Sequence, residues 1–372
     1  MKKLHRRPTR FKGTTVGIDL HKTFLQYSVL SIEGEETHAD RAPSRPDALS
    51  GLLDRWCADD TSVQVCLEAS GCFLWAYDLL VDRLGPAHVH VAAPSKVRVI
   101  ADSMEKNDAN DAWWLAYLLW ESRLPGAFVA VGDLRELRIA SRELRSVVDE
   151  CGDLKRRMKS HLAQLGLGFS ASAWASLKGR SQVRALVASV EPAHGVRGES
   201  IAHLWRRIEA MDEEVLHWRG RVDALSSAFD QIKVLRDSLA GVGPQTAAVV
   251  WSELGDPSRY RSAKSYAKAT GLTPGYRESG GRRSSQKITR MGSAHVRWAL
   301  TRAVLSCTRC TKDPGGRAVR HWLERAQKRK PKKAAIVAAA RKLAEAIWRL
   351  FALGEAFDLT RAFGRPPAEV AA

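Results

Sequence analysis

Residues 14–20 read TTVGIDL, an apolar stretch rich in β-branched residues that carries one carboxylate, Asp19, near its end. A second apolar stretch, FLQYSVLS at 24–31, follows after a tight turn, and two more stand at 62–68 (SVQVCLE) and 88–94 (HVHVAAP). β-Branched and aromatic side chains favour strands. We therefore predict a strand in each of these four segments.

Helical segments are expected between and after these strands. A meander of strands followed by alternating strands and helices is typical of a layered α/β or α+β domain with a mixed sheet. Pro125 and Gly126 close this region, so we place the first domain at residues 1–126. The helices are expected near 46–57, 71–84, 95–103 and 108–122.

Two long segments further along the chain carry a heptad pattern. Apolar positions alternate steps of three and four over 133–165, where the seam includes His161, and again over 201–232. This spacing predicts either a long antiparallel helix pair or a dimerising coiled coil. The connector, 166–200, is expected to be a shorter helical region with loops. We assign 127–233 to a coiled-coil and helical insert that serves oligomerisation, and 234–372 to a mainly α-helical C-terminal domain.

The charge of the chain is strongly basic and unevenly spread. The 372 residues carry a formal net charge of +18, and the sequence pI is near 9.9. From Arg259 to Arg349 there are 24 Lys and Arg against 4 Asp and Glu, whereas residues 13–258 are slightly acidic. A basic excess of this size predicts a polyanionic partner, most often a nucleic acid. The run AQKRKPKKAA at 326–335 is expected to contact phosphate, or else to be a solvated loop.

The sequence favours a cytoplasmic protein. The basic N-terminus is not followed by the unbroken apolar segment of a signal peptide, and no apolar run is long enough to span a membrane. Six cysteines fall without a disulfide framework, which suits a reducing compartment. Cys307 and Cys310 form a C-x-x-C, for which two small residues on one helix face are favoured over a zinc site with His295 or His321.

Four carboxylates in the first domain stand at strand ends or at a helix start. Asp19 lies within a strand, where a carboxylate is costly to bury unless it is paired or metal-bound. Glu68 ends the third strand, and Asp108 and Asp111 lie on one face at the start of a helix. Converging carboxylates would suit Mg²⁺ or Mn²⁺, and two such ions can clamp a phosphodiester.

Simpler interpretations of these carboxylates stay open. Asp108 alone would serve as an N-cap, and Asp111 would complement the helix dipole. Asp19 would equally form an ion pair with His21 or Lys22.

Two further motifs lie in the basic half. In LAGVGPQTAAVV (239–250), Gly241 and Gly243 permit a tight turn before a helix N-terminus, as in a helix-hairpin-helix that binds DNA phosphates; a simple turn is the alternative. In GLTPGYRESGGRRSSQKITRMGS (271–293), Ser279 precedes two glycines that leave its hydroxyl open. A serine that attacks a phosphodiester needs such access and nearby cations, although a loop of this composition is common. Rival serines are Ser284 and Ser285, and the cations expected to bind nucleic acid are Arg282, Arg283, Lys287 and Arg290.

Together these motifs resemble a family of insertion-sequence transposases with an N-terminal RuvC-like DEDD domain and a C-terminal domain that has an active-site serine. The resemblance rests on GIDLHK, LEASG, KNDANDAWWLA, LAGVGPQTAAVV and GLTPGYRESGGRR, in this order, and runs from about residue 14 to 350. It implies an RNase H-like fold, then a coiled coil, then the C-terminal domain.

The resemblance also implies a function. Members are similar in being site-specific DNA recombinases guided by a structured noncoding bridge RNA, and in assembling as multimers (a dimer or tetramer here) with composite sites. Carried over, Asp19, Glu68, Asp108 and Asp111 would hold Mg²⁺, and Ser279 would form a transient covalent link to DNA. The rival functions are a RuvC-like metal-dependent junction nuclease without that link, and a non-catalytic nucleic-acid-binding protein.

Overall fold

The structure is a computed structural model of the chain. It describes residues 11–58, 62–94, 96–97, 108–238, 241–279, 282–355 and 359–364, and within 276–286 it describes the backbone alone. The chain divides into two compact units, Met1–Val129 and Ala130–Ala372, and each is treated by itself.

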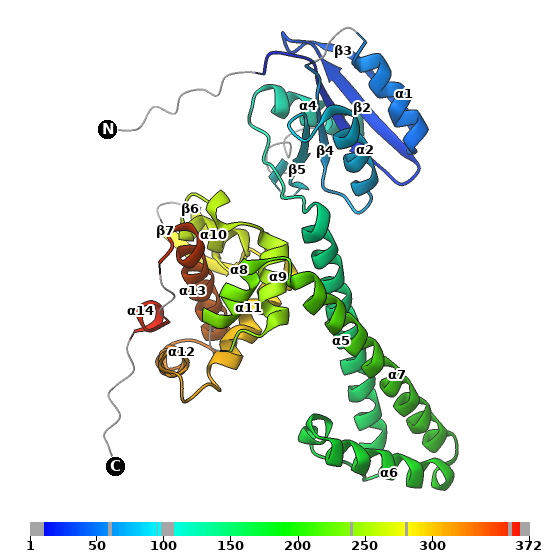
Figure 1. Ribbon diagram of the computed structural model, residues 1–372, viewed down its shortest axis with the longest axis vertical. Helices are drawn as coiled ribbons and strands as arrows, with labels where there is room; N and C mark the ends of the chain where they lie inside the picture. The colour runs from blue at the N-terminus through cyan, green and yellow to red at the C-terminus, as the bar shows by residue number, and fades with distance from the viewer. Residues whose placement is uncertain are drawn as a thin grey trace. The chain divides into compact units, whose positions relative to one another are not determined.

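A five-stranded mixed sheet forms the centre of the first unit (Figure 1). Its order is β3-β2-β1-β4-β5, in which β1 pairs antiparallel with β2 and parallel with β4. Three antiparallel strands that run on into parallel neighbours give an RNase H-like arrangement, and the predicted mixed sheet is confirmed. The strands are β1 Thr15–Leu20, β2 Phe24–Leu30, β3 Glu36–Pro43, β4 Gln64–Glu68 and β5 Val89–Ala92.

The strand β3 is absent from the sequence prediction. It pairs with β2 at the edge of the sheet, and nearly all of its side chains are exposed. An edge strand of this kind carries no alternation of apolar and polar residues, so its sequence, ETHADRAP, does not resemble a half-buried strand.

Helices cover both faces of the sheet. On one face α1 (Pro46–Trp56) and α2 (Leu74–Leu84) pack against Val16 and Ile18 of β1. On the other face α4 (Asp108–Trp120) packs against β1 and β4. Of the further helix predicted over 95–103, residue 95 and residues 98–103 lie outside the described residues.

Gly17 determines how closely α4 approaches the sheet. Side chains alternate along a strand, so Gly17 and Asp19 share the face opposite Val16 and Ile18. A Cβ atom at Gly17 would collide with the backbone carbonyl oxygen of Ala112 and lie 2.5 Å from the backbone nitrogen of Ala116. The absence of a side chain therefore lets the α4 backbone lie directly on β1.

Two long helices open the second unit. They are α5 (Gly132–Ala163) and α7 (Gly195–Ser226), with α6 (Leu177–Ala193) and the short 3-10 helix Ala171–Ala175 between them. The first half of α5 shares a core with the second half of α7, and the second half of α5 with the first half of α7. The two helices are therefore antiparallel (Figure 1).

Most of both predicted heptad seams lies in this pair, with one shift of register. The second seam, predicted over 201–232, runs past the end of α7 at Ser226, so that Phe229 lies in the turn and Ile232 in α8. Met158 is followed in the core by Leu162, where the pattern had placed His161. Because the two seams pack against each other within one chain, the heptads are accounted for without a dimer.

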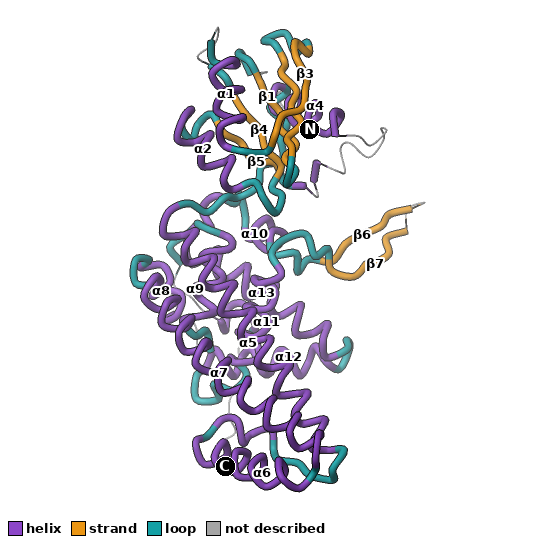
Figure 2. Tube along the Cα trace, turned by 90° about the vertical axis from the view of Figure 1, so that its right-hand side faces the viewer, coloured by secondary structure: helices purple, strands orange, loops and turns teal. Residues whose placement is uncertain are grey.

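Helices form most of the rest of the second unit, joined by one hairpin that the sequence did not predict. Strands β6 (Pro274–Ser279) and β7 (Arg282–Ile288) pair antiparallel, and Figure 2 shows them extending away from the helices of their own unit. No helix within the described ranges is long and apolar enough to cross a membrane. The helices are α8 Asp230–Ser238, α9 Pro244–Leu254, α10 Ala263–Ala269, α11 Ala294–Cys307, α12 Pro314–Gln327, α13 Lys332–Ala352 and α14 Leu359–Phe363, with a 3-10 turn at Pro257–Arg259.

The contact at Gly17 is testable by substitution. Gly17→Ala should lower the free energy of unfolding by about 1–3 kcal/mol, because the added methyl overpacks the interface between β1 and α4. Gly51→Ala is the control: Gly51 lies in α1 with open space around it, and alanine there should be neutral or stabilise by about 0.5–1 kcal/mol. Chemical denaturation of both variants measures this, and equal stabilities would contradict the close packing.

Candidate metal centre

Two carboxylates stand at the ends of neighbouring parallel strands. The register of β1 and β4 pairs Ile18 with Leu67, and the next residues along are Asp19 and Glu68. Residues at matching positions of paired strands project from the same face, so both carboxylates belong to the face that α4 covers. The sheet thus brings Asp19 and Glu68, which are far apart in the sequence, to one edge.

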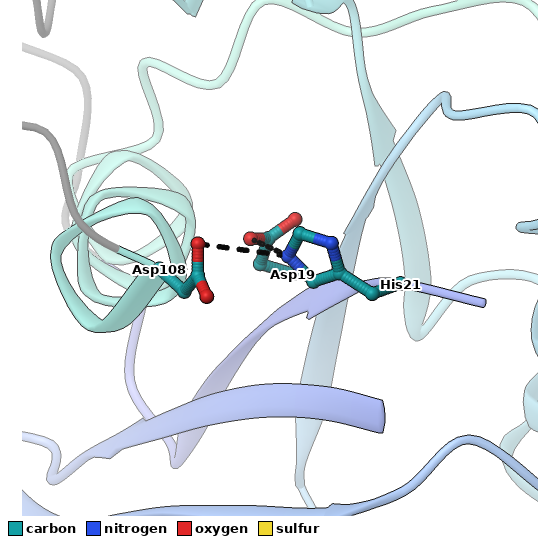
Figure 3. A group of neighbouring side chains, drawn as sticks. All are labelled: Asp19, His21 and Asp108. Carbon is teal, nitrogen blue, oxygen red and sulfur yellow. Dashed lines mark hydrogen bonds and ion pairs between the residues drawn. The ribbon is translucent and has the colours of Figure 1, made fainter. Parts of the chain in front are cut away.

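The first turn of α4 adds a third carboxylate (Figure 3). The His21 Nε2–H donates to Asp19 Oδ2 at 2.9 Å, and the same nitrogen lies 3.7 Å from Asp108 Oδ1. One ligand atom from each of these three residues lies within 4.8 Å of the others. The approach of α4 at Gly17 is what brings the helix start to the end of β1.

The electrostatics of this group are dominated by the burial of Asp19. Burial is the largest effect and raises the pKa of the Asp19 carboxyl; His21 opposes the rise, whereas Asp111 and Asp108 add to it. The Asp19 side chain is 13% exposed and that of Asp108 is 41% exposed. Asp19 is therefore held in a site that disfavours its charge unless a cation is present.

Side chains from β2 and β3 border the group. Arg41 Nη2 lies 3.4 Å from Asp108 Oδ2, and the guanidinium stands 4.0 Å from the centre of the Phe24 ring. His21 stacks on that same ring, with 4.4 Å between ring centroids. Phe24 thus holds one cation and one imidazole beside the carboxylates.

The donor set fits a divalent cation. Two carboxylates and an imidazole are ligands that divalent metals accept, and carboxylate oxygens suit Mg²⁺ or Mn²⁺ in particular. Burial, with a smaller contribution from Asp111 and Asp108, raises the pKa of Asp19, so a nearby positive charge would stabilise its charged form. The ion pair with His21, weighed in the sequence as the simpler role of Asp19, is present too.

Two of the four predicted ligands lie in the group, and two do not. Asp19 and Asp108 belong to the group, together with His21, which the sequence offered as a partner of Asp19 rather than as a ligand. Glu68 and Asp111 are half-buried and are not among the three residues of that group, although Asp111 is near enough to raise the pKa of Asp19. The signal for His21 was its place directly after the strand, two residues beyond Asp19.

The G-V-G-P turn joins α8 to α9 in the second unit. Gly241 has φ +84° and packs against the backbone of Ser306 and Cys307, where a Cβ atom has no room. Gly243 is the N-cap residue of α9, and as a glycine it has no side chain that could cap the helix. The two glycines therefore have different roles: one allows a close contact, and the other opens a helix N-terminus.

Ser279 lies at the end of β6, paired with Arg282 across the hairpin. Gly280 and Gly281 lie outside the described residues, as do the side chains of Ser279, Arg282, Arg283, Ser284 and Ser285. Lys287 and Arg290 are exposed, and Arg290 has φ +56°. The backbone thus places the serine near the tip of a projecting basic hairpin.

The two cysteines of the C-x-x-C are not part of a metal-ligand group. Burial raises the pKa of the Cys307 thiol to about 12, and the Cys310 thiol donates to the Ser306 carbonyl oxygen. Among the described residues, clustered metal ligands occur at Asp19, His21 and Asp108 alone, so neither His295 nor His321 joins the thiols. The favoured interpretation, two small residues on one helix face, is wrong for Cys310: α11 ends at Cys307, and Cys310 lies after the turn that follows.

An RNase H-like sheet with carboxylates gathered at the ends of its central strands defines the class of the first unit: a fold with a nuclease-type acidic centre. Residues 16–166 match the family profile DEDD_Tnp_IS110, described as "Transposase", and residues 235–319 match the profile described as "Transposase IS116/IS110/IS902 family". The two matches cover well over half of the chain, which belongs to the IS110 family of transposases.

A curated relative supports this assignment. The chain is 28% identical over 162 residues to a protein of Sinorhizobium fredii (strain NBRC 101917 / NGR234) named "Putative transposase y4pF/y4sB". The match covers 44% of this chain and 40% of the relative, so the chain spans less than half the length of the curated relative that it matches.

Metal binding is testable without any measurement of activity. Mg²⁺ or Mn²⁺ should raise the melting temperature of the protein, because a ligand that binds only the folded state stabilises it. Asp19→Asn should abolish that rise, whereas Asp82→Asn, on the exposed side of α2, should retain it. An equal metal-dependent rise in both variants would contradict a site at Asp19.

The raised pKa of Asp19 has a consequence for the metal-free protein. Because the folded state favours the protonated carboxyl, its contribution to stability is present at low pH and is lost as the pH rises through the raised pKa. The free energy of unfolding of Asp19→Asn minus that of the wild type should therefore increase with pH across this range. Denaturation in EDTA at a series of pH values measures the difference; one that does not change with pH would contradict the assignment.

Proposed function

We propose that the protein cleaves and rejoins DNA strands as the transposase of an insertion sequence. The observation that carries the proposal is the grouping of Asp19 and Asp108 at the end of β1 in an RNase H-like unit, in a chain of this family. The basic balance of residues 259–349 supports DNA as the substrate, since phosphate contacts dominate the affinity for nucleic acids.

The acidic centre would hold Mg²⁺, with Mn²⁺ as a substitute. The ligands would be Asp19, Glu68, Asp108 and Asp111, and a bound cation would stabilise the charge that develops on a scissile phosphate. His21 would then exchange its contact with Asp19 for a place beside the phosphate or the metal. Arg41 would hold Asp108 in position through their ion pair.

Ser279 would be the nucleophile. Its Oγ would attack a DNA phosphorus, so that a serine–phosphate ester forms while the bond from phosphorus to a deoxyribose oxygen breaks. The serine proton ends on the released DNA hydroxyl. A hydroxyl of another strand would then attack the ester and return the serine to its starting form. Arg282, Arg283, Lys287 and Arg290 would stabilise the charged phosphate during both steps.

A structured guide RNA and a second protomer would complete the assembly. The chain has basic surface beyond the hairpin: residues 327–334 are exposed and run from the end of α12 through the turn into the first turn of α13, which favours a nucleic-acid contact there. Composite sites would pair the acidic centre of one protomer with the serine of another. The surfaces for this contact lie outside the two heptad seams, because these are buried within the chain.

The serine separates this proposal from its rivals. Ser279→Ala should abolish strand exchange and covalent protein–DNA adducts, whereas Ser284→Ala and Ser285→Ala, in the same hairpin, should retain both. Adducts are measured by denaturing gel electrophoresis after incubation with element-end DNA and the flanking noncoding RNA. Full strand exchange in Ser279→Ala would contradict the covalent route.

Two other outcomes would favour one of the two rival functions. Metal-dependent cutting of DNA junctions without adducts in the wild type would indicate a RuvC-like nuclease. Unchanged function in Asp108→Asn and Asp111→Asn would indicate a protein that binds nucleic acid without catalysis.

A further inference from the structure

A pocket of about 280 Å³ opens in the second unit, between α5, α7, α9 and α11. A water molecule takes up ~30 Å³ in the liquid, so the pocket has room for a group several times larger. Three arginines line it, Arg145, Arg219 and Arg302, and no aspartate or glutamate is among its lining residues. The pocket is therefore a cationic concavity contributed by separate helices.

Two of the three arginines stand over one indole. The Arg145 guanidinium stands 4.2 Å from the centre of a ring of Trp298, and the Arg302 guanidinium stands 5.3 Å from it. A tryptophan ring attracts cations at this range, so Trp298 holds two like charges near each other. Arg145 pairs with Asp149, and Arg219 and Arg302 have exposed positions on α7 and α11.

The N-terminus of α9 forms another wall. Gly243 has no side chain to cap the helix, and Pro244 occupies its first position. The next backbone N–H groups, those of Gln245 and Thr246, have no acceptor within the helix. Both residues line the pocket, and the positive end of the helix dipole favours an anion there.

A buried hydroxyl lacks a partner at the same place. Ser141 of α5 is 4% exposed, and its Oγ has no hydrogen-bond partner within the described part of the chain. Ser141 lines the pocket. A buried polar atom without a partner is unfavourable, so this hydroxyl points to an acceptor that a ligand would bring.

We propose that this pocket binds one phosphodiester group of a nucleic-acid strand. Phosphate oxygens accept from guanidinium groups, from backbone N–H groups at a helix start and from a serine hydroxyl, and the pocket supplies all three. The inference rests on the proposed function, which supplies the nucleic acid whose phosphate would bind. A strand is favoured over a free ion because Arg219 and Arg302 are exposed, where a continuing backbone could pass.

The test is the binding of a short mixed-sequence DNA duplex to the full chain in EDTA. Arg219→Gln combined with Arg302→Gln should weaken binding by about tenfold or more, and should lower the slope of log affinity against log salt concentration by about two. The control combines Arg221→Gln on α7 with Arg309→Gln in the turn directly after α11; both arginines are exposed and do not line the pocket. The control should retain most of the affinity.

Ser141→Ala tests the buried hydroxyl. It should weaken duplex binding several-fold without lowering the melting temperature, because alanine removes an unpaired polar atom from the interior. If the pocket pair and the control pair lose duplex affinity equally, the loss reflects net charge alone and the proposal is overturned. Full duplex affinity in the pocket pair would overturn it as well.

Inorganic phosphate tests whether the pocket binds a free anion rather than a phosphate of a strand. If it raises the melting temperature of the wild type but not of the pocket pair, while both bind DNA equally, the pocket holds a free anion and the strand assignment is wrong. Because binding is measured without metal, failure of strand cleavage leaves this test intact. A wild type that binds the duplex but never cuts it would contradict the proposed function alone.

Discussion

The contact between Gly17 and α4 is the constraint on which the acidic centre depends. Because β1 has no side chain at this position, the α4 backbone lies directly on the strand. The first turn of the helix then stands beside the end of β1, where Asp108 approaches Asp19 and His21. A larger residue at position 17 would move α4 outward and separate these side chains, even though Asp19, His21 and Asp108 themselves would be unchanged.

In the second unit a glycine also allows two backbones to pack closely, here at the turn before α9. Gly241 lets the turn before α9 pack against the backbone of α11, and the open N-terminus of α9 faces a pocket lined by arginines. In both units a glycine brings a helix start to a place where charge is concentrated. A DNA-cleaving enzyme that uses a metal must bring together two pairs of opposite charges. One is the anionic DNA strand with cationic side chains, and the other is the metal ion with carboxylates.

Much of the fold was predictable because burial leaves a pattern. The strands β1, β2, β4 and β5 are apolar, and the heptads of α5 and α7 record a seam. The exposed strand β3 buries too little to leave such a signal, and the sequences of β6 (PGYRES) and β7 (RRSSQKI) are mostly polar. Asp19 and Asp108 could be named from the sequence, and the position of His21 two residues beyond Asp19 offered it as a partner. Its place beside Asp108 depends on the stacking on Phe24 and on the position of α4, which the spacing to Asp19 does not encode.

The central claim is that the carboxylates at the ends of β1 and β4 and at the start of α4 share a divalent cation. Anomalous scattering from crystals grown with Mn²⁺ tests it most directly. The account predicts a manganese peak within bonding distance of carboxylate oxygens of Asp19 and Asp108, with His21 displaced from its contact with Asp19 or bound to the metal. Crystals with no peak there, in which the Asp19–His21 pair is unchanged at saturating Mn²⁺, would contradict it.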